Sequence, residues 1–275
     1  MKVDGHIHTP FCPHGTKDTF EQYISNAINL GFQEISFTEH APLPQTFFDT
    51  TPDQDSGMDH SLLEDYFSTL SALKSKHKSD IKINIGLEVD YIEGYEEGTK
   101  QFLNEYGQYL DDSILSVHFL KKDDNYFCLD FSAELFEHMI TKFSTIEAIY
   151  EKYYQTLLFS IRSDLGKYKP KRIGHITLVH KFQKKFPVSR SFRTEINEVL
   201  TSISKHKLQL DYNGAGVMKP LCGEPYPPDW VIEEAHKQKI PLVYGSDAHS
   251  SKDLGQGLTN ILSTAKLSSP AETNL

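Results

Sequence analysis

The stretch IKINIGLEV (residues 81–89) alternates apolar and polar residues from end to end. Its apolar side chains would share one face of an extended chain, because successive side chains of a strand point to opposite faces. The preceding residues, 59–77, carry apolar side chains at a spacing near 3.6, which indicates a helix. This helix and strand together suggest the repeating unit from which the fold is built.

Similar strand-like and helix-like stretches alternate along most of the chain. Besides 81–89, the expected strands are 2–8, 34–38, 113–119, 172–176, 208–213 and 241–246. The expected helices are 18–30, 59–77, 95–109, 133–161, 190–206 and 228–238. Seven strands alternating with helices predict an α/β fold whose parallel sheet closes as a barrel, although an open doubly wound sheet has the same pattern. The length favours a single domain, residues 1–275.

The composition restricts the class of protein. A chain of 275 residues with 38% apolar residues can bury a large core. Its formal net charge of −10 argues against general nucleic-acid binding, which needs a basic face. Three cysteines favour a reducing compartment over a disulfide framework. Without a signal-like start or an apolar run of about 20 residues, we expect a cytoplasmic protein that does not contact membranes.

Histidines and carboxylates gather where the expected strands end, which is where α/β barrels place their active sites. The residues with this placement are His6, His8, His14, His40, Glu88, His118, His175, Asp247 and His249. A single histidine in a strand is more often a core residue than a ligand. The whole set predicts a metal site, since imidazole is a common ligand and buried carboxylates need partners. Loops 41–57 and 218–229 would cover it.

The donor set indicates which metals would bind. Nitrogen and oxygen donors suit Zn, Mn or Fe better than Ca or Mg. Nine ligands are too many for one ion and more than two ions need, but they fit three ions. Glu88 can bridge two ions through its two oxygens. Cys12 could add a thiolate, although a plain loop cysteine is the favoured interpretation. Several divalent ions would let an acidic protein hold a phosphate dianion and activate water.

Other polar residues have weaker claims to the site. Arg162 and Arg193 lie near a strand end and a helix start, where phosphate is favoured, but a surface role is the default. Asp90 would share a face with Glu88, so it could orient a ligand, bind a cationic substrate group or simply cap a helix. We interpret the lysines of KFQKKF (residues 181–186) as a solvated face rather than a phosphate clamp.

The motifs, taken in order, resemble those of the PHP (polymerase and histidinol phosphatase) superfamily. They are DGHIHTPFCPHG (4–15), FTEHAPLP (37–44), IGLEVDY (85–91), SVHF (116–119), IGHITLV (173–179) and VYGSDAHS (243–250). The stretch LDYNGAGVMKPLCGEPY (210–226), followed by PPDW, resembles the histidinol-phosphate phosphatase branch. The resemblance runs from residue 3 to about 257. The ordered set is highly specific, whereas any one motif is not.

This resemblance implies a distorted, TIM-like barrel of seven β/α units with three divalent ions at the carboxyl ends of its strands. The implied ligand sets are His6, His8, Glu88 and Asp247 for one ion, Glu88, His118 and His175 for the second, and His14, His40 and His249 for the third. The implied reaction is hydrolysis of L-histidinol phosphate to L-histidinol and phosphate, in histidine biosynthesis, by a hydroxide that bridges the ions.

Roles for the remaining groups are expectations of the same kind. Asp247 or a histidine such as His249 would move protons, and Arg162 with Arg193 would hold the phosphate. Asp90 or another acid would bind the substrate's ammonium group. Met218 occupies a loop that often carries a basic residue in this branch, so the contacts of that loop are left open.

Three alternatives remain at this point. The site could act on other phosphomonoesters, nucleotides or DNA ends, although an acidic chain without a basic groove argues against DNA. The chain could be a non-catalytic metal-binding module, but such a module should lack ligands, and here every motif position is filled. A metal-dependent amide hydrolase on a related barrel would often use a carbamylated lysine where this chain has Glu88. The identity of the metals and the oligomeric state are open.

Overall fold

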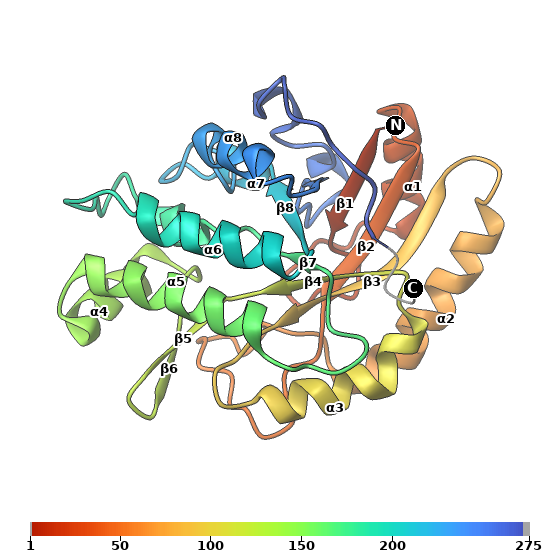
Figure 1. Ribbon diagram of the computed structural model, residues 1–275. Coiled ribbons are helices and arrows are strands. Elements are labelled where there is room, and N and C mark those ends of the chain that lie inside the picture. Colours follow the sequence, from red (N-terminus) through yellow and green to blue (C-terminus); the bar gives the residue numbers. More distant parts are fainter. Residues whose placement is uncertain (1, 272–275) are drawn as a thin grey trace.

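The computed structural model describes residues 2–271, and its centre is a seven-stranded parallel sheet (Figure 1). The strand order is β1-β2-β3-β4-β7-β8-β9, so each strand lies beside the next parallel strand along the chain. The bounds are β1 Val3–Ile7, β2 Glu34–His40, β3 Lys82–Asp90, β4 Asp112–Ser116, β7 Arg172–Ile173, β8 Gln209–Asn213 and β9 Leu242–Gly245. All seven strands expected from the sequence are therefore present.

The sheet curves until its last strand meets its first. The backbone N–H of Asp247, just after β9, donates to the carbonyl of His6 at 2.7 Å, and His8 N–H donates to Ala248 at 3.0 Å. Gly245 permits this approach, because a Cβ at that position would collide with the Cβ of His6. The predicted barrel is confirmed in a distorted form, and its closure places the His6–His8 strand beside Asp247.

Helices surround this sheet. They are α1 Phe20–Asn29, α2 Leu63–Lys76, α3 Glu96–Tyr106, α4 Ala133–Phe143, α5 Ile146–Arg162, α6 Arg193–Lys205, α7 Ala215–Met218 and α8 Asp229–Lys237. Local sequence sets their ends. Thr19, for example, accepts a hydrogen bond from Gln22 N–H, and the Gln22 side chain accepts one from Thr19 N–H, which is a capping box at the start of α1.

The segment 133–161 differs from the single helix that was expected. Ser144 has φ +75°, outside the helical region, so α4 ends there. Thr145 then caps a new helix, α5, by accepting a hydrogen bond from Ala148 N–H. The apolar spacing continues through the break because both helices pack on the same core, which is why periodicity alone missed it.

A short antiparallel hairpin was also missed. It consists of β5 Phe119–Lys122 and β6 Asn125–Cys128 and projects beside β4 (Figure 1). The expected strand 113–119 ends at Ser116 instead, and Phe119 begins the hairpin. The expected strand 172–176 is likewise shortened, to Arg172–Ile173. Both changes leave His118 and His175 in irregular backbone just beyond a strand end, where side chains can turn toward a shared cavity.

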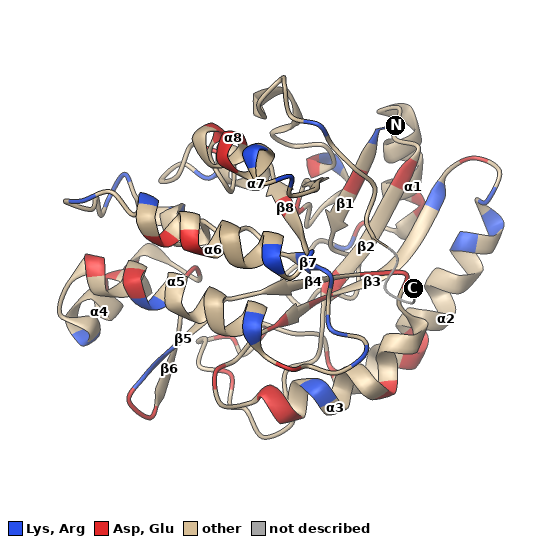
Figure 2. Cartoon of the chain, viewed as in Figure 1, with Lys and Arg blue, Asp and Glu red and all other residues tan. Residues whose placement is uncertain are grey.

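The barrel interior holds a buried cation. Arg172 is fully buried and donates to Asp112 Oδ2 at 2.6 Å and to the Gly5 carbonyl at 2.7 Å, with Asp211 Oδ1 at 3.5 Å. A buried guanidinium needs such partners to offset its lost hydration. At the surface, α3, α5 and α6 each carry side chains of both charges (Figure 2). No helix within residues 2–271 is both long and apolar enough to cross a bilayer.

Candidate metal centre

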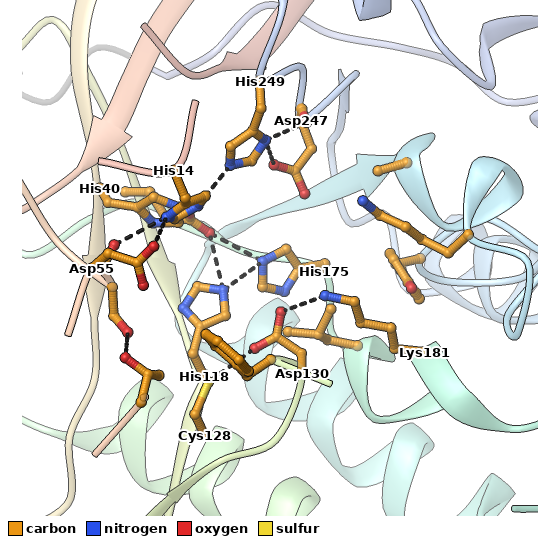
Figure 3. Close-up of a pocket in the computed structure, with 18 of the residues that line it drawn as sticks. His14, His40, Asp55, His118, Cys128, Asp130, His175, Lys181, Asp247 and His249 are labelled. Atoms are coloured by element: carbon orange, nitrogen blue, oxygen red, sulfur yellow. Dashed lines mark hydrogen bonds and ion pairs between the residues drawn. The ribbon is translucent and has the colours of Figure 1, made fainter. Parts of the chain in front are cut away.

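A cavity of about 560 Å³ opens at the carboxyl ends of the strands. Most of the predicted ligands line it, namely His14, His40, Glu88, His118, His175, Asp247 and His249 (Figure 3). His6 and His8 lie behind them and are fully buried. Loop 41–57 contributes Asp53 and Asp55, and loop 218–229 contributes Met218 and Tyr226, so both loops border the cavity as expected.

Glu88 lies at the centre of the imidazoles, with only 2% of its surface exposed. Its Oε2 faces three rings, at 3.2 Å from His40 Nδ1, 3.4 Å from His6 Nε2 and 3.6 Å from His8 Nε2. Its Oε1 faces two more, at 3.0 Å from His175 Nε2 and 3.8 Å from His118 Nε2. Each carboxylate oxygen therefore faces a different set of nitrogens, which is the geometry of a bridging ligand.

The charge state of Glu88 follows from these neighbours. Burial alone would raise the pKa of its carboxyl group, but the imidazoles of His6 and His118 outweigh burial and hold the pKa well below its usual value. Ser116 Oγ also donates to Oε1 at 2.6 Å, which fixes the carboxylate plane. Glu88 is thus ionised at neutral pH and oriented from the neighbouring strand.

Three groups of side chains bring their donor atoms within 4.8 Å of one another. One contains His6, His8 and Asp247, and a second contains Glu88, His118 and His175. The third contains His8, Cys12, His40 and His249. The second group coincides with an expected ligand set, and the first contains the other expected set except for Glu88. The third has Cys12 and His8 in place of His14, and burial together with the nearby Glu39 raises the pKa of the Cys12 thiol, which favours its protonated form.

His14 lies at the open edge of the third group. Its Nε2 is 3.2 Å from His249 Nε2. The Nδ1 of His14 is 3.0 Å from the Asp55 carbonyl, and the Nδ1 of His249 is 3.1 Å from the Asp247 carbonyl. A carbonyl only accepts hydrogen bonds, so both Nδ1 atoms donate and the two Nε2 atoms face each other. Two imidazole nitrogens that face each other in this way are placed to share a cation.

His6 gives a second reason to expect a cation. Its Nε2 is buried and has no hydrogen-bond partner, although Glu88 Oε2 lies at 3.4 Å and Asp247 Oδ1 at 3.8 Å. Leaving a buried polar atom unpaired costs about 1–3 kcal/mol. A divalent ion bound to this nitrogen and to both carboxylates would offset that cost, so the residues present fit a metal site.

Carboxylates behind the rings orient them. Asp211 Oδ2 lies 3.0 Å from His6 Nδ1, Glu39 Oε1 lies 3.3 Å from His8 Nδ1, and Asp90 Oδ1 lies 2.7 Å from His118 Nδ1. Metal-binding histidines commonly donate their second N–H to such a carboxylate, which fixes the ring. Glu39 and Asp211 were missed from the sequence. For Glu39, the available signal was an acid on β2, the strand beside the histidine-bearing β1, whereas Asp211 lies on β8, which does not pair with β1.

Asp247 is held in an unusual backbone conformation, with φ +54°. Its Oδ1 lies 3.0 Å from His8 Nε2, and its Oδ2 accepts a hydrogen bond from Asn213 at 3.1 Å. Burial would raise the pKa of Asp247, but His6 and His8 hold it well below its usual value. For His249, burial and the charge on His8 push the pKa well below the usual value, so this ring is neutral.

The predicted arginines are not in the site, and the expectation for them is corrected. Arg162 ends α5, where its guanidinium lies 3.3 Å from Glu198 on the surface. Helices in a β/α barrel run opposite to the strands, so a helix ends at the far side from the carboxyl ends of the strands. Arg193 begins α6 on the outer layer, and its guanidinium stacks 4.2 Å over the Trp230 ring.

Asp90 does not line the cavity, and instead it supports His118. The acid that does line the cavity beside His118 is Asp130, which receives Lys181 Nζ at 2.9 Å. Neither residue of this pair was selected from the sequence. Lys181 belongs to the short 3-10 helix Leu178–Phe182, just beyond His175. This position, soon after a strand that leads to a predicted ligand, is the sequence feature that could have marked Lys181 as a cavity residue.

Comparison with known proteins agrees with this geometry. The PHP domain family model matches residues 4–215. The histidinol-phosphatase of Bacillus subtilis is 50% identical over 257 residues, covering 93% of this chain and 96% of that protein. Among solved structures, a Listeria monocytogenes protein assigned as a histidinol phosphatase superposes with a TM-score of 0.91 at 41% identity, covering 95% of this chain and all of that one.

The fold is also shared with a more distant protein. The Lactococcus lactis histidinol phosphate phosphatase, solved in complex with Zn, L-histidinol and phosphate, gives a TM-score of 0.73 at 21% identity and covers 98% of this chain and 96% of that one. At this identity the likeness establishes the fold alone. The family is established by the PHP match and by the identity to the Bacillus protein: this chain belongs to the PHP-domain histidinol-phosphatase family.

Proposed function

We propose that this chain is a metal-dependent phosphomonoesterase that hydrolyses L-histidinol phosphate to L-histidinol and phosphate, a step of histidine biosynthesis. The observation that carries the proposal is the position of Glu88, whose two oxygens face separate sets of imidazoles. A buried carboxylate shared in this way suits a site with two or more ions, and such sites commonly hydrolyse phosphate esters. The identity to the Bacillus histidinol-phosphatase supports the choice of substrate.

We assign three divalent ions to the cavity. The assigned ligands are His6, His8, Glu88 and Asp247 for the first ion, Glu88, His118 and His175 for the second, and His14, His40 and His249 for the third. Zn, Mn and Fe all suit these donors, and Zn is favoured by its presence in the Lactococcus structure. When bound, the ions would lower the pKa of water and neutralise charge on the phosphate.

The chain's own residues would manage the proton. Asp247 and His249 both border the cavity, with 18% and 30% of their side chains exposed. The Nδ1–H of His249 donates a hydrogen bond to the backbone carbonyl of Asp247. Because the Nε2 of His249 is assigned to the third ion, the carboxylate of Asp247 is the group that would take a proton from the attacking water and return it to the leaving oxygen, with His249 holding the Asp247 backbone in place.

The rest of the cavity suits the histidinol portion of the substrate. A phosphate group alone would leave much of its 560 Å³ empty. Phe131, Leu178 and Met218 form an apolar part of the lining, against which an imidazole ring can pack. Asp53 and Asp55 line the opening and would pair with the substrate's ammonium group, the role first expected for Asp90.

We further propose that residues 1–275 form one domain, because all the assigned ligands lie on the strands of a single continuous sheet or in the segments that directly follow them. The three cysteines are free thiols, which supports a cytoplasmic location.

A substrate panel tests the proposal. Phosphate release would be followed with L-histidinol phosphate, nucleoside monophosphates, p-nitrophenyl phosphate and a short single-stranded DNA with a terminal phosphate. We expect kcat/KM to be highest for L-histidinol phosphate by at least about a hundredfold, since polar contacts to a matched substrate give selectivity of that order. Equal or greater kcat/KM for a nucleotide or the DNA end would overturn the substrate assignment.

A further inference from the structure

The cavity has few cations of its own. The chain contains four arginines, at positions 162, 172, 190 and 193. Arg172 is buried in the barrel against Asp112, and Arg190 lies on the surface with Glu151 and Glu195. Arg162 and Arg193 lie on the outer helices, as described above. Among the residues that line the cavity in the described part of the chain, the only lysines or arginines are Lys181 and Lys219.

Lys181 differs from Lys219 in being built into the wall. Its side chain is only 21% exposed, whereas Lys219 is an exposed residue of the rim. Figure 3 shows Lys181 extended toward Asp130, close to the rings of His118 and His175. The ammonium group lies 2.9 Å from Asp130 Oδ2. Lys181 therefore places a fixed positive charge beside the Glu88–His118–His175 group.

The ammonium of Lys181 retains donors for a ligand. A lysine ammonium has three N–H donors, and the structure gives it one acceptor, Asp130. A phosphate monoester dianion carries three terminal oxygens with several lone pairs each, and a charged donor in a partly buried site strengthens its binding. Lysine is well suited to this role as a compact point charge.

We infer that Lys181 binds the phosphoryl group of the substrate. Its ammonium donates to a phosphate oxygen that faces away from the metal ligands, and Asp130 is a positioning residue that holds the ammonium there. The inference rests on the proposed function only in requiring a phosphate ester as substrate, and it does not require histidinol as the alcohol. It also gives a role to a lysine for which the sequence suggested only a solvated face.

The pair has a simpler explanation that must be separated from this one. Asp130 follows the hairpin strand β6, and Lys181 follows β7, so their ion pair could merely tie two segments together. A purely structural pair is broken equally by removing either partner. A phosphate contact behaves differently, because replacing Asp130 leaves the positive charge in the cavity while replacing Lys181 removes it.

The test measures binding of inorganic phosphate to the metal-loaded protein by calorimetry, with metal content and melting temperature determined for each variant. Lys181→Met should weaken phosphate binding about 10- to 100-fold, the usual range for a lost hydrogen bond between charged groups. Lys181→Arg should recover most of this loss. Lys185→Met is the matched control, since Lys185 pairs with Glu137 and does not line the cavity, and it should bind phosphate as the unmodified protein does.

Asp130→Asn decides between the two explanations. A phosphate contact predicts that Asp130→Asn loses clearly less phosphate binding than Lys181→Met, because the ammonium stays in the cavity but is held there less firmly. Loss of phosphate binding equal to that of Lys181→Met would overturn the inference, as would unchanged binding in Lys181→Met with full metal content. Because inorganic phosphate is the probe, a failure of L-histidinol phosphate as a substrate would contradict the proposed function and leave this inference standing.

Discussion

Oδ1 of Asp90 lies 2.7 Å from Nδ1 of His118, and this contact turns the other ring nitrogen of His118 toward Glu88 and His175. The Nε2 atoms of His118 and His175 are 3.3 Å apart. The carboxylate of Asp90 therefore fixes which nitrogen of His118 is available to an ion, although Asp90 itself does not line the cavity.

Removing this support should weaken metal binding without removing a ligand. We expect Asp90→Ala to lower the affinity for the ion at Glu88, His118 and His175 by about 10- to 100-fold, the usual effect of losing a carboxylate behind a ligating histidine. Asp90→Asn, which can still accept the hydrogen bond, should lie between Asp90→Ala and the unmodified protein. Metal titration of the metal-free protein measures this. The exposed Asp124→Ala is the control, and equal affinity in all four proteins would refute the supporting role.

Replacement of Glu88 should have a larger effect. Glu88→Gln keeps the shape of the side chain but removes the charge and one of the oxygens that face the two sets of rings. We expect kcat/KM to fall by at least about a hundredfold, with a lower metal content, because two ion sites are disturbed together. Activity assays and elemental analysis of the same samples measure this, with the surface variant Glu198→Gln as control. Near-normal turnover of Glu88→Gln at full metal content would contradict a bridging role for Glu88.

The two surface arginines should be dispensable for the reaction. Arg162→Ala removes a partner of Glu198 on an exposed helix end, so we expect kcat/KM to change by less than about twofold and stability to change by at most about 1 kcal/mol. Arg193→Ala also removes a contact with the Trp230 ring and should cost about 0.5–1 kcal/mol of stability, again with normal activity. Steady-state kinetics and urea unfolding measure these effects. A large loss of kcat/KM with an intact fold would return these arginines to the site.

Metal binding should release protons. In the metal-free protein, burial lowers the pKa of His8, but hydrogen bonds to Asp247 and Glu39 outweigh it and raise the pKa to about 9. For His118, the neighbouring Asp90 outweighs burial and raises the pKa to about 10. Both values lie above the usual 6.5, so these rings stabilise the metal-free fold through their protons below pH 6.5, and this contribution is lost as the pH rises through about 9 to 10.

An ion binds the neutral ring, so it must displace these protons. For His6, burial lowers the pKa, but Glu88 and Asp211 outweigh burial and hold it well above its usual value. We therefore expect about three protons released on loading near pH 7.5 and an apparent metal affinity that increases with pH up to about 10. Calorimetry in buffers of different ionisation enthalpy counts the protons. Loading with no proton release at pH 7.5 would show that the rings are already neutral.

Much of this molecule could be predicted because its signals are local. The alternation in residues 81–89 and the placement of His6, Glu88 and Asp247 at strand ends follow from the periods of strands and helices. The order of the motifs along the chain also allowed the family to be predicted. The structure brings all nine predicted ligands to one cavity and its floor.

Most of the parts that were missed depend on tertiary contacts. The break at Ser144 is hidden because both flanking helices bury apolar faces on one core. Arg162 was misplaced although the predicted barrel already puts the end of a helix on the far side from the cavity, so this error was avoidable from the sequence. Glu39 and Asp211 act through rings on other strands, and their roles appear only when the sheet is assembled.

The most direct test of the account is stepwise reloading of the metal-free protein with Zn, Mn or Fe. It measures kcat/KM for L-histidinol phosphate and the metal-to-protein ratio in the same samples. We predict no measurable turnover without metal and a turnover that rises with loading to a maximum only when more than one ion is bound per chain. Hydrolysis of L-histidinol phosphate by the metal-free protein at the rate of the loaded protein, or no hydrolysis by the fully loaded protein, would contradict the account.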